Sequence, residues 1–94
     1  MRFVSFEPLI EDLGEFSLKG VDWAIVGGES DLTNPRPMKP EWAESIRRIC
    51  KRDGVAFWFK QNGGRGGDEA GGDLLNGVQY HTYPSMKQDG QETA

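Results

Sequence analysis

The sequence predicts a small α/β protein with about three parallel strands, one main helix and a C-terminal β-hairpin. Three short apolar runs lack polar alternation, which is typical of parallel strands covered on both faces. Each run ends abruptly at a charged residue or at glycines, and one amphipathic segment separates the second run from the third. The 94 residues suffice for one small domain, which we place at residues 1–84 with a disordered tail at residues 85–94.

The first strand is predicted at Arg2–Phe6, and it ends at Glu7-Pro8. The segment after it has room for only one or two helical turns before Gly14 and Gly20 interrupt them. Parallel strands normally need a dozen or more connecting residues, and the span from Glu7 to Gly20 just suffices.

The second strand, Trp23–Val26, stops at the run Gly27-Gly28-Glu29-Ser30. Glycines let the backbone turn without a Cβ clash, so Glu29 should emerge at the carboxyl end of this strand. The long loop from Gly27 to Lys39 then contains two prolines that favour extended or turn conformations. Loops of this length after a strand are often functional.

The helix is predicted at Pro40–Arg52, because proline suits the first helical position and Gly54 is placed to cap the end. Acidic residues lie near its start and basic residues near its end, as the helix dipole favours. An apolar stripe at helical spacing should pack on the sheet. The stripe consists of Trp42, Ile46, Ile49 and Cys50.

The third strand, Val55–Phe59, follows the helix directly and ends at Lys60-Gln61. The segment from Gly63 to Gly72 is rich in glycine and lacks an apolar anchor, so we expect a mobile loop. Asn76-Gly77 lies between apolar pairs, which is a strong signal for a two-residue hairpin turn.

Composition restricts the function classes. Eleven basic and fifteen acidic residues give a net charge of −4, which argues against a dedicated nucleic-acid binder. No apolar stretch approaches the roughly 18 residues of a membrane helix, and we expect a cytoplasmic protein without a membrane partner. The single cysteine, Cys50, excludes an internal disulfide framework and a cysteine-rich metal motif within this chain.

Several motifs occur in an order and spacing that resemble one family. Together they span nearly the whole chain from Arg2 to Pro84. They are Phe3-Val4-Ser5-Phe6-Glu7-Pro8-Leu9, Asp22-Trp23-Ala24-Ile25-Val26-Gly27-Gly28-Glu29-Ser30, Arg36-Pro37-Met38, Trp42, Arg47 with Cys50, Gly54-Val55, Phe57-Trp58-Phe59-Lys60-Gln61 and Gly72-Asp73-Leu74-Leu75-Asn76-Gly77. The sequence resembles the C-terminal part of a family of phage and bacterial proteins of unknown function, whose full-length members are assigned a radical-SAM-like β/α barrel.

This resemblance implies that the chain is a partial (β/α) barrel-like unit. Full-length relatives carry an N-terminal cysteine cluster like the iron–sulfur motif of enzymes that use S-adenosylmethionine, and this chain has no such cluster. We therefore expect a fragment of a radical-SAM-like barrel without catalysis of its own, and with no cofactor held by this chain alone. The chain also departs from the family pattern at Asp31, usually glycine, and at Asn62, usually tryptophan.

Three charged residues, Glu7, Glu29 and Lys60, should converge at the carboxyl end of the sheet if the strands are neighbours. That end is where α/β folds place their sites, and the three could orient a substrate or the amino acid and ribose portions of S-adenosylmethionine. The alternative is an ion network that only neutralises buried charge. The remaining candidate binding residues are Gly27, Gly28, Ser30, Arg36 and Gln61. No catalytic residue and no metal ligand is assigned.

Other conspicuous side chains have a simpler interpretation. Cys50 is best explained as a small buried hydrophobic residue, and Trp42, Phe57 and Trp58 as core rather than a stacking platform. His81 has no evident partner, and Arg36 should pack on the sheet edge or pair with an aspartate such as Asp31.

Two alternative functions stay open. A partial barrel leaves strand edges and an apolar face uncovered, so the chain could complete its sheet as a homodimer or with the missing N-terminal barrel portion. The phage context of the family also suggests a nucleic-acid accessory role, against which the net charge argues.

Overall fold

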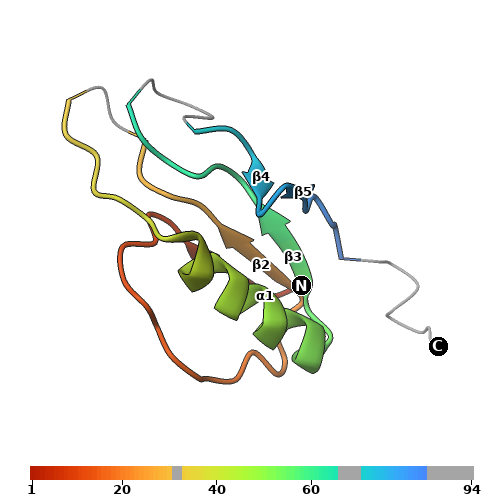
Figure 1. Cartoon of the computed structure of the whole chain (residues 1–94). Helices are drawn as coiled ribbons and strands as arrows, with labels where there is room; N and C mark the ends of the chain where they lie inside the picture. The colour runs from red at the N-terminus through yellow and green to blue at the C-terminus, as the bar shows by residue number, and fades with distance from the viewer. Residues whose placement is uncertain (31–32, 66–70, 85–94) are drawn as a thin grey trace.

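The computed structural model describes residues 1–30, 33–65 and 71–84, which form one sheet, one helix and a hairpin (Figure 1). Strands β1 (Phe3–Phe6), β2 (Trp23–Val26) and β3 (Ala56–Phe59) are parallel and lie in the order β1-β2-β3. The expected α/β architecture is therefore confirmed. In chain order the elements are β1 (Phe3–Phe6), β2 (Trp23–Val26), α1 (Pro40–Asp53), β3 (Ala56–Phe59), β4 (Leu74–Leu75) and β5 (Val78–Gln79). The tail at 85–94 and the centre of the glycine-rich segment lie outside the described residues.

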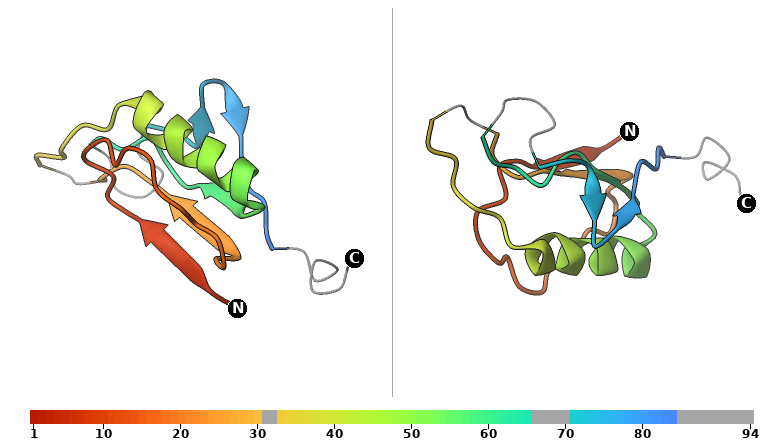
Figure 2. Two further views of the ribbon diagram at one scale, coloured as in Figure 1. Left: turned by 90° about the horizontal axis from the view of Figure 1, so that it is seen from below. Right: turned by 45° about the horizontal axis from the view of Figure 1, so that its top comes forward.

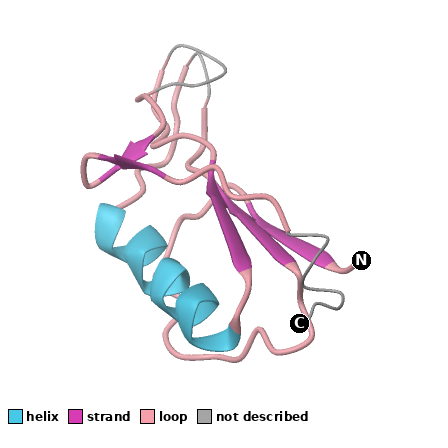
Figure 3. Ribbon diagram, turned by 90° about the vertical axis from the view of Figure 1, so that its right-hand side faces the viewer, coloured by secondary structure: helices cyan, strands magenta, loops and turns pink. Residues whose placement is uncertain are grey.

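The strand register gives the sheet two unlike faces. Phe6, Val26 and Phe59 lie in one row across the sheet, on the face that packs against α1 (Figure 3). The alternate positions, such as Ser5, Ile25 and Trp58, lie on the opposite face. The prediction that the strands are covered on both faces is wrong, because the one helix of the described chain covers only one of them.

Helix α1 forms as the sequence predicts and runs one residue further, to Asp53. Proline stands at its start, Glu41 lies in the first turn, and Gly54 ends it in the left-handed conformation. The buried stripe is slightly rotated from the expected one, because Trp42 is only partly buried. The buried helical residues are Ala43, Ile46, Ile49 and Cys50.

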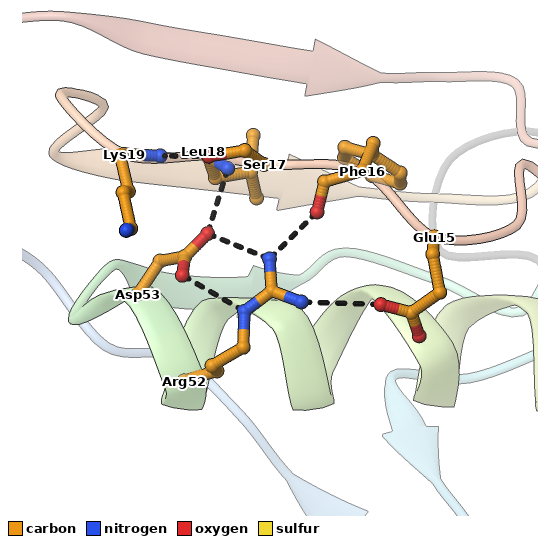
Figure 4. A network of polar contacts seen from close by, with 7 residues as sticks. All are labelled: Glu15, Phe16, Ser17, Leu18, Lys19, Arg52 and Asp53. Atoms are coloured by element: carbon orange, nitrogen blue, oxygen red, sulfur yellow. Dashed lines mark hydrogen bonds and ion pairs between the residues drawn. The ribbon is translucent and has the colours of Figure 1, made fainter.

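The connection from β1 to β2 lies on the helix side of the sheet and contains no helix, so the expected helical turns are absent. It is held by two residues at the end of α1 instead (Figure 4). Arg52 donates from Nη2 to the Phe16 carbonyl at 2.6 Å, and Asp53 accepts from the Leu18 backbone N–H at 2.8 Å. These bonds satisfy backbone groups that a helix would otherwise pair, and Leu18 is buried in the core.

The C-terminal hairpin is a separate two-stranded sheet, and the chain that follows it pairs with the outer edge of β3. Asn76 and Gly77 adopt φ values of 51° and 83°, as a type I′ turn requires, so the predicted hairpin is confirmed. Strand β4 contacts α1, and the hairpin lies beside it (Figure 2). The chain then returns along β3, where the Phe59 N–H donates to the Tyr80 carbonyl at 2.7 Å.

Candidate functional site

The carboxyl end of the sheet brings together two of the three predicted charges. Glu7 follows β1 and Lys60 follows β3, and Lys60 Nζ lies 3.2 Å from Glu7 Oε2. The two strands are not neighbours, so the pair reaches across the end of β2, where Gly27 offers no side chain. A Cβ at Gly27 would lie 2.9 Å from Gln61 Nε2 and 3.4 Å from the Glu7 carboxyl carbon. Gly27 therefore leaves the space in which these polar groups meet.

Gln61 forms a hydrogen bond with Glu7 and is itself almost completely buried, with 1% of its surface exposed. Its Nε2 donates to the Gly28 carbonyl at 2.6 Å and to Glu7 Oε2 at 3.2 Å. Its Oε1 is buried and accepts no hydrogen bond from any residue that the structure describes. Because a buried acceptor without a donor is costly, this oxygen marks a position that favours a donor group.

Glu29 does not join this group, contrary to the predicted convergence. It forms a two-pronged ion pair with Arg36, with Nε–Oε1 at 2.9 Å and Nη2–Oε2 at 2.8 Å. The Arg36 backbone N–H also donates to Glu29 at 2.8 Å. The side-chain bonds from Arg36 hold the pKa of Glu29 at about 2, well below its ordinary value of 4.5. This pair fixes the loop after β2 and leaves Glu29 with its charge already satisfied.

The expected partner of Arg36, Asp31, lies outside the described residues. The observed partner, Glu29, stands seven positions away in the sequence.

Gly28 and Ser30, the other predicted site residues after β2, pack the loop that follows β2 against the loop that follows β3. The Gly28 N–H donates to the Gln61 carbonyl at 2.9 Å, and a Cβ at Gly28 would lie 2.1 Å from the Asn62 carbonyl oxygen. Ser30 continues the same contact in a parallel bridge with Gly64. Gly28 is thus required by close backbone approach, and the expected turn is not the reason for it.

Asn62 anchors the approach to the hairpin. Its Nδ2 lies within hydrogen-bond distance of three backbone carbonyls, at 2.8 Å from Leu74 and at 3.2 Å from Gly71 and Gly72. The side chain therefore supports the chain that leads to Asp73 and His81.

The open face of the sheet carries a hollow of about 560 Å³, which lies within the range of small-molecule sites. Its walls are mostly apolar and carry five aromatic rings, and Glu7 and Lys60 also line it. The Trp23 indole N–H donates to the Thr82 carbonyl at 2.9 Å, which holds that ring in place. The aromatic lining residues are Phe3, Trp23, Trp58, His81 and Tyr83. A preformed hollow of this size suits a small ligand with an apolar, planar part.

Trp58 departs from its prediction as a core residue, because it lies on the open face in this hollow. The His81 ring stacks on it with centroids 4.2 Å apart and an interplanar angle of 12°. His81 Nε2 also lies 3.3 Å from Asp73 Oδ2. The alternation along β3 could have placed Trp58 on the same face as Lys60, but no sequence signal joins His81 or Asp73 to it.

The donor set does not fit an iron–sulfur cluster. Cys50 is the one cysteine of the sequence, and it lies buried in the helix–sheet core as predicted. Burial raises the pKa of its thiol to about 11, so it is a poor thiolate ligand. Within residues 1–30, 33–65 and 71–84, no group of three acidic, histidine or cysteine side chains could hold a metal ion.

Fold and site together define a small α/β protein with a parallel sheet, a helix on one face and a ligand-sized aromatic hollow on the other. The family model described as "Protein of unknown function (DUF5131)" matches residues 1–84, and the chain belongs to this family. No curated protein and no solved structure matches the chain. Within the described part, α1 is too short and too polar to cross a membrane.

Proposed function

We propose that this chain is the C-terminal part of a radical-SAM-like β/α barrel, and that it contributes one side of a small-molecule site without catalysing a reaction alone. Three parallel strands with a helix on one face support the barrel origin. In such a barrel the open aromatic face would be the inner face. The carboxyl ends of the strands, with Glu7 and Lys60, would lie where barrel enzymes bind their substrates.

The Glu7–Lys60 pair carries the ligand-binding part of this proposal. The Lys60 and Glu7 side chains are 50% and 27% exposed, and such pairs contribute only about 0–1 kcal/mol, so a ligand can replace the contact at little cost. Glu7 would bind an ammonium group and Lys60 a carboxylate. The pair therefore suits a ligand with an amino acid group.

S-adenosylmethionine is the first ligand to test, because its amino acid portion carries both groups and its adenine ring is planar. The aromatic hollow beside the pair would hold the ring. We derive no reaction step, because the single buried cysteine does not suit a cluster. The chain's part is to bind and orient.

The test is a backbone amide NMR titration of the purified chain with S-adenosylmethionine. We expect shifts at Glu7, Gly27–Ser30 and Lys60, and a loss of affinity of about tenfold to a hundredfold in Lys60→Ala, since a charge-assisted bond contributes roughly 1.5–3 kcal/mol. Lys51→Ala is the matched control, because Lys51 is exposed on α1 and does not line the hollow.

Two results would contradict the proposal. Amide signals that do not shift at millimolar S-adenosylmethionine, or equal affinity of the Lys60→Ala and Lys51→Ala variants, would contradict the proposed binding role. Turnover by the isolated chain would contradict the proposal that it does not catalyse alone.

A further inference from the structure

His81 has a defined orientation on the open face, because the backbone places it directly opposite Trp58. The Phe59 N–H donates to the Tyr80 carbonyl at 2.7 Å, and a corresponding bond from the Thr82 N–H lies on the other side of the pair. Trp58 and His81 are therefore a non-hydrogen-bonded antiparallel pair, in which Cα atoms lie about 4.5 Å apart and side chains approach most closely. This geometry explains why the two rings stack at 4.2 Å, nearly parallel.

Asp73 determines which nitrogen of this imidazole carries the proton. His81 Nε2 lies 3.3 Å from Asp73 Oδ2, and the Gln79 side chain donates to the same oxygen at 3.1 Å, which fixes the carboxylate. An ionised carboxylate is an acceptor only. The neutral imidazole therefore keeps its proton on Nε2 and presents Nδ1 as a hydrogen-bond acceptor.

The Nδ1 atom of His81 is available to a ligand. No hydrogen bond to it comes from residues 1–30, 33–65 or 71–84, and Gln61 Oε1 is the one side-chain nitrogen or oxygen of these ranges that is both buried and without a partner. Nδ1 is therefore accessible to solvent, and the ring that carries it lines the hollow. A fixed, accessible acceptor in a mostly apolar wall favours a ligand that brings a donor.

The hollow holds this acceptor at a set distance from the Glu7–Lys60 pair. Lys60 follows Trp58 by two residues, and His81 lies across from Trp58, so the Cα atoms of Lys60 and His81 should be about 8 Å apart. A single amino acid with a bicyclic side chain spans this separation. Its ammonium and carboxylate groups would meet Glu7 and Lys60 while the far edge of its ring reaches His81.

We propose that His81 is a specificity-determining residue of the hollow, and that the ligand is an amino acid whose planar ring carries an N–H donor. The ring donates to His81 Nδ1, Asp73 holds the imidazole in the accepting tautomer, and the apolar walls contact the ring. This inference rests on the proposed function, since it uses the same hollow, and it deepens that function by adding a chemical requirement for the ligand.

The test compares tryptophan with its sulfur isostere 3-benzothienylalanine, which has nearly the same shape and lacks the ring N–H. Both are titrated into the purified full chain, and the dissociation constants are taken from amide NMR shifts. The wild-type chain should bind tryptophan about fivefold more tightly, which is the ratio that a typical net hydrogen bond gives.

Two variants assign this preference to the imidazole nitrogen. His81→Phe keeps a planar ring opposite Trp58 and removes the acceptor, so it should bind both compounds equally. Asp73→Asn offers an amide N–H to Nε2, which moves the imidazole proton to Nδ1, so the preference should fall below about twofold. Tyr80→Phe is the matched control and should keep the preference, because Tyr80 packs against Phe57 and does not line the hollow.

The wild-type comparison needs no variant, so it stays decisive if a substitution impairs folding. Equal affinity for the two amino acids, or a preference that persists in His81→Phe, would overturn the inference and leave the binding role of the Glu7–Lys60 pair intact. If neither amino acid binds at millimolar concentration, the inference fails. If S-adenosylmethionine then also fails to bind, the proposed function fails with it.

Discussion

The two faces of the sheet are built from the same three strands and yet have opposite properties. On the face under α1, Phe59 is 0% exposed and Phe57, Val26 and Ala24 are buried with it. On the other face, residues one position away along each strand line a hollow that is open to solvent. The difference arises from the helix, which covers one face only. The covered face supplies most of the buried core, and the open face keeps a hollow that is accessible to solvent.

The largest expected effect separates these two faces directly. Phe59→Ala removes a fully buried ring and should lower the free energy of unfolding by about 3–5 kcal/mol. Trp58→Ala, one residue earlier on the open face, should cost less than half as much, because the ring is partly exposed. Urea unfolding followed by circular dichroism measures both. Equal losses would mean that the open face is covered in solution.

A smaller effect is expected where the loops after β2 and β3 meet. Gly28→Ala places a Cβ 2.1 Å from the Asn62 carbonyl oxygen, so the two loops must separate, at a cost of about 1–3 kcal/mol. Gly54→Ala is the comparison, because a Cβ there meets no atom within 4 Å and only the left-handed φ of 73° is strained. Its cost should be about 1 kcal/mol.

The same Gly28 variant should also disturb the Glu7–Lys60 pair, because Gly28 binds Gln61 through both its N–H and its carbonyl. Amide shifts at Glu7 and Lys60 would report this change. If Gly28→Ala is no more destabilising than Gly54→Ala, the loops are not closely packed in solution.

The smallest effect concerns pH. Hydrogen bonds from the Arg52 side chain, and then from the Leu18 backbone, hold the pKa of Asp53 at about 2, below its ordinary value of 3.8. A depressed carboxyl pKa adds stability above the unfolded value, and that stability is lost as the pH falls from about 4 toward 2. The midpoint temperature of thermal unfolding should therefore fall as the pH is lowered over this range.

The network in Figure 4 predicts which variant flattens this pH dependence. Asp53→Asn should reduce the slope of stability between about pH 4 and pH 2, because it removes the titrating group. Glu29→Gln should act in the same window and direction, since the pKa of Glu29 is also about 2. An unchanged acid transition in both variants would contradict these assignments.

How much of the site could be predicted is clear from Glu7, Lys60 and Glu29. Strand ends placed Glu7 and Lys60 at one edge of the sheet, and the structure joins them at 3.2 Å. Glu29 satisfied the same rule and still turned to Arg36, because a nearby guanidinium with two parallel N–H groups binds a carboxylate better than a distant ammonium. A position at the end of a strand predicts where the backbone of a residue lies. The partner that its side chain binds depends on the geometry of the loop that follows.

The sequence by itself determined the strands, the helix with its caps, and the Asn76-Gly77 hairpin. These features depend on neighbours a few positions apart, through apolar runs, helical spacing and turn residues. Tertiary structure alone decided that the crossover needs no helix, that Trp58 lies on the open face, and that His81 stacks on it beside Asp73. Those outcomes depend on which face a single helix covers and on how distant segments meet, and no local pattern records either.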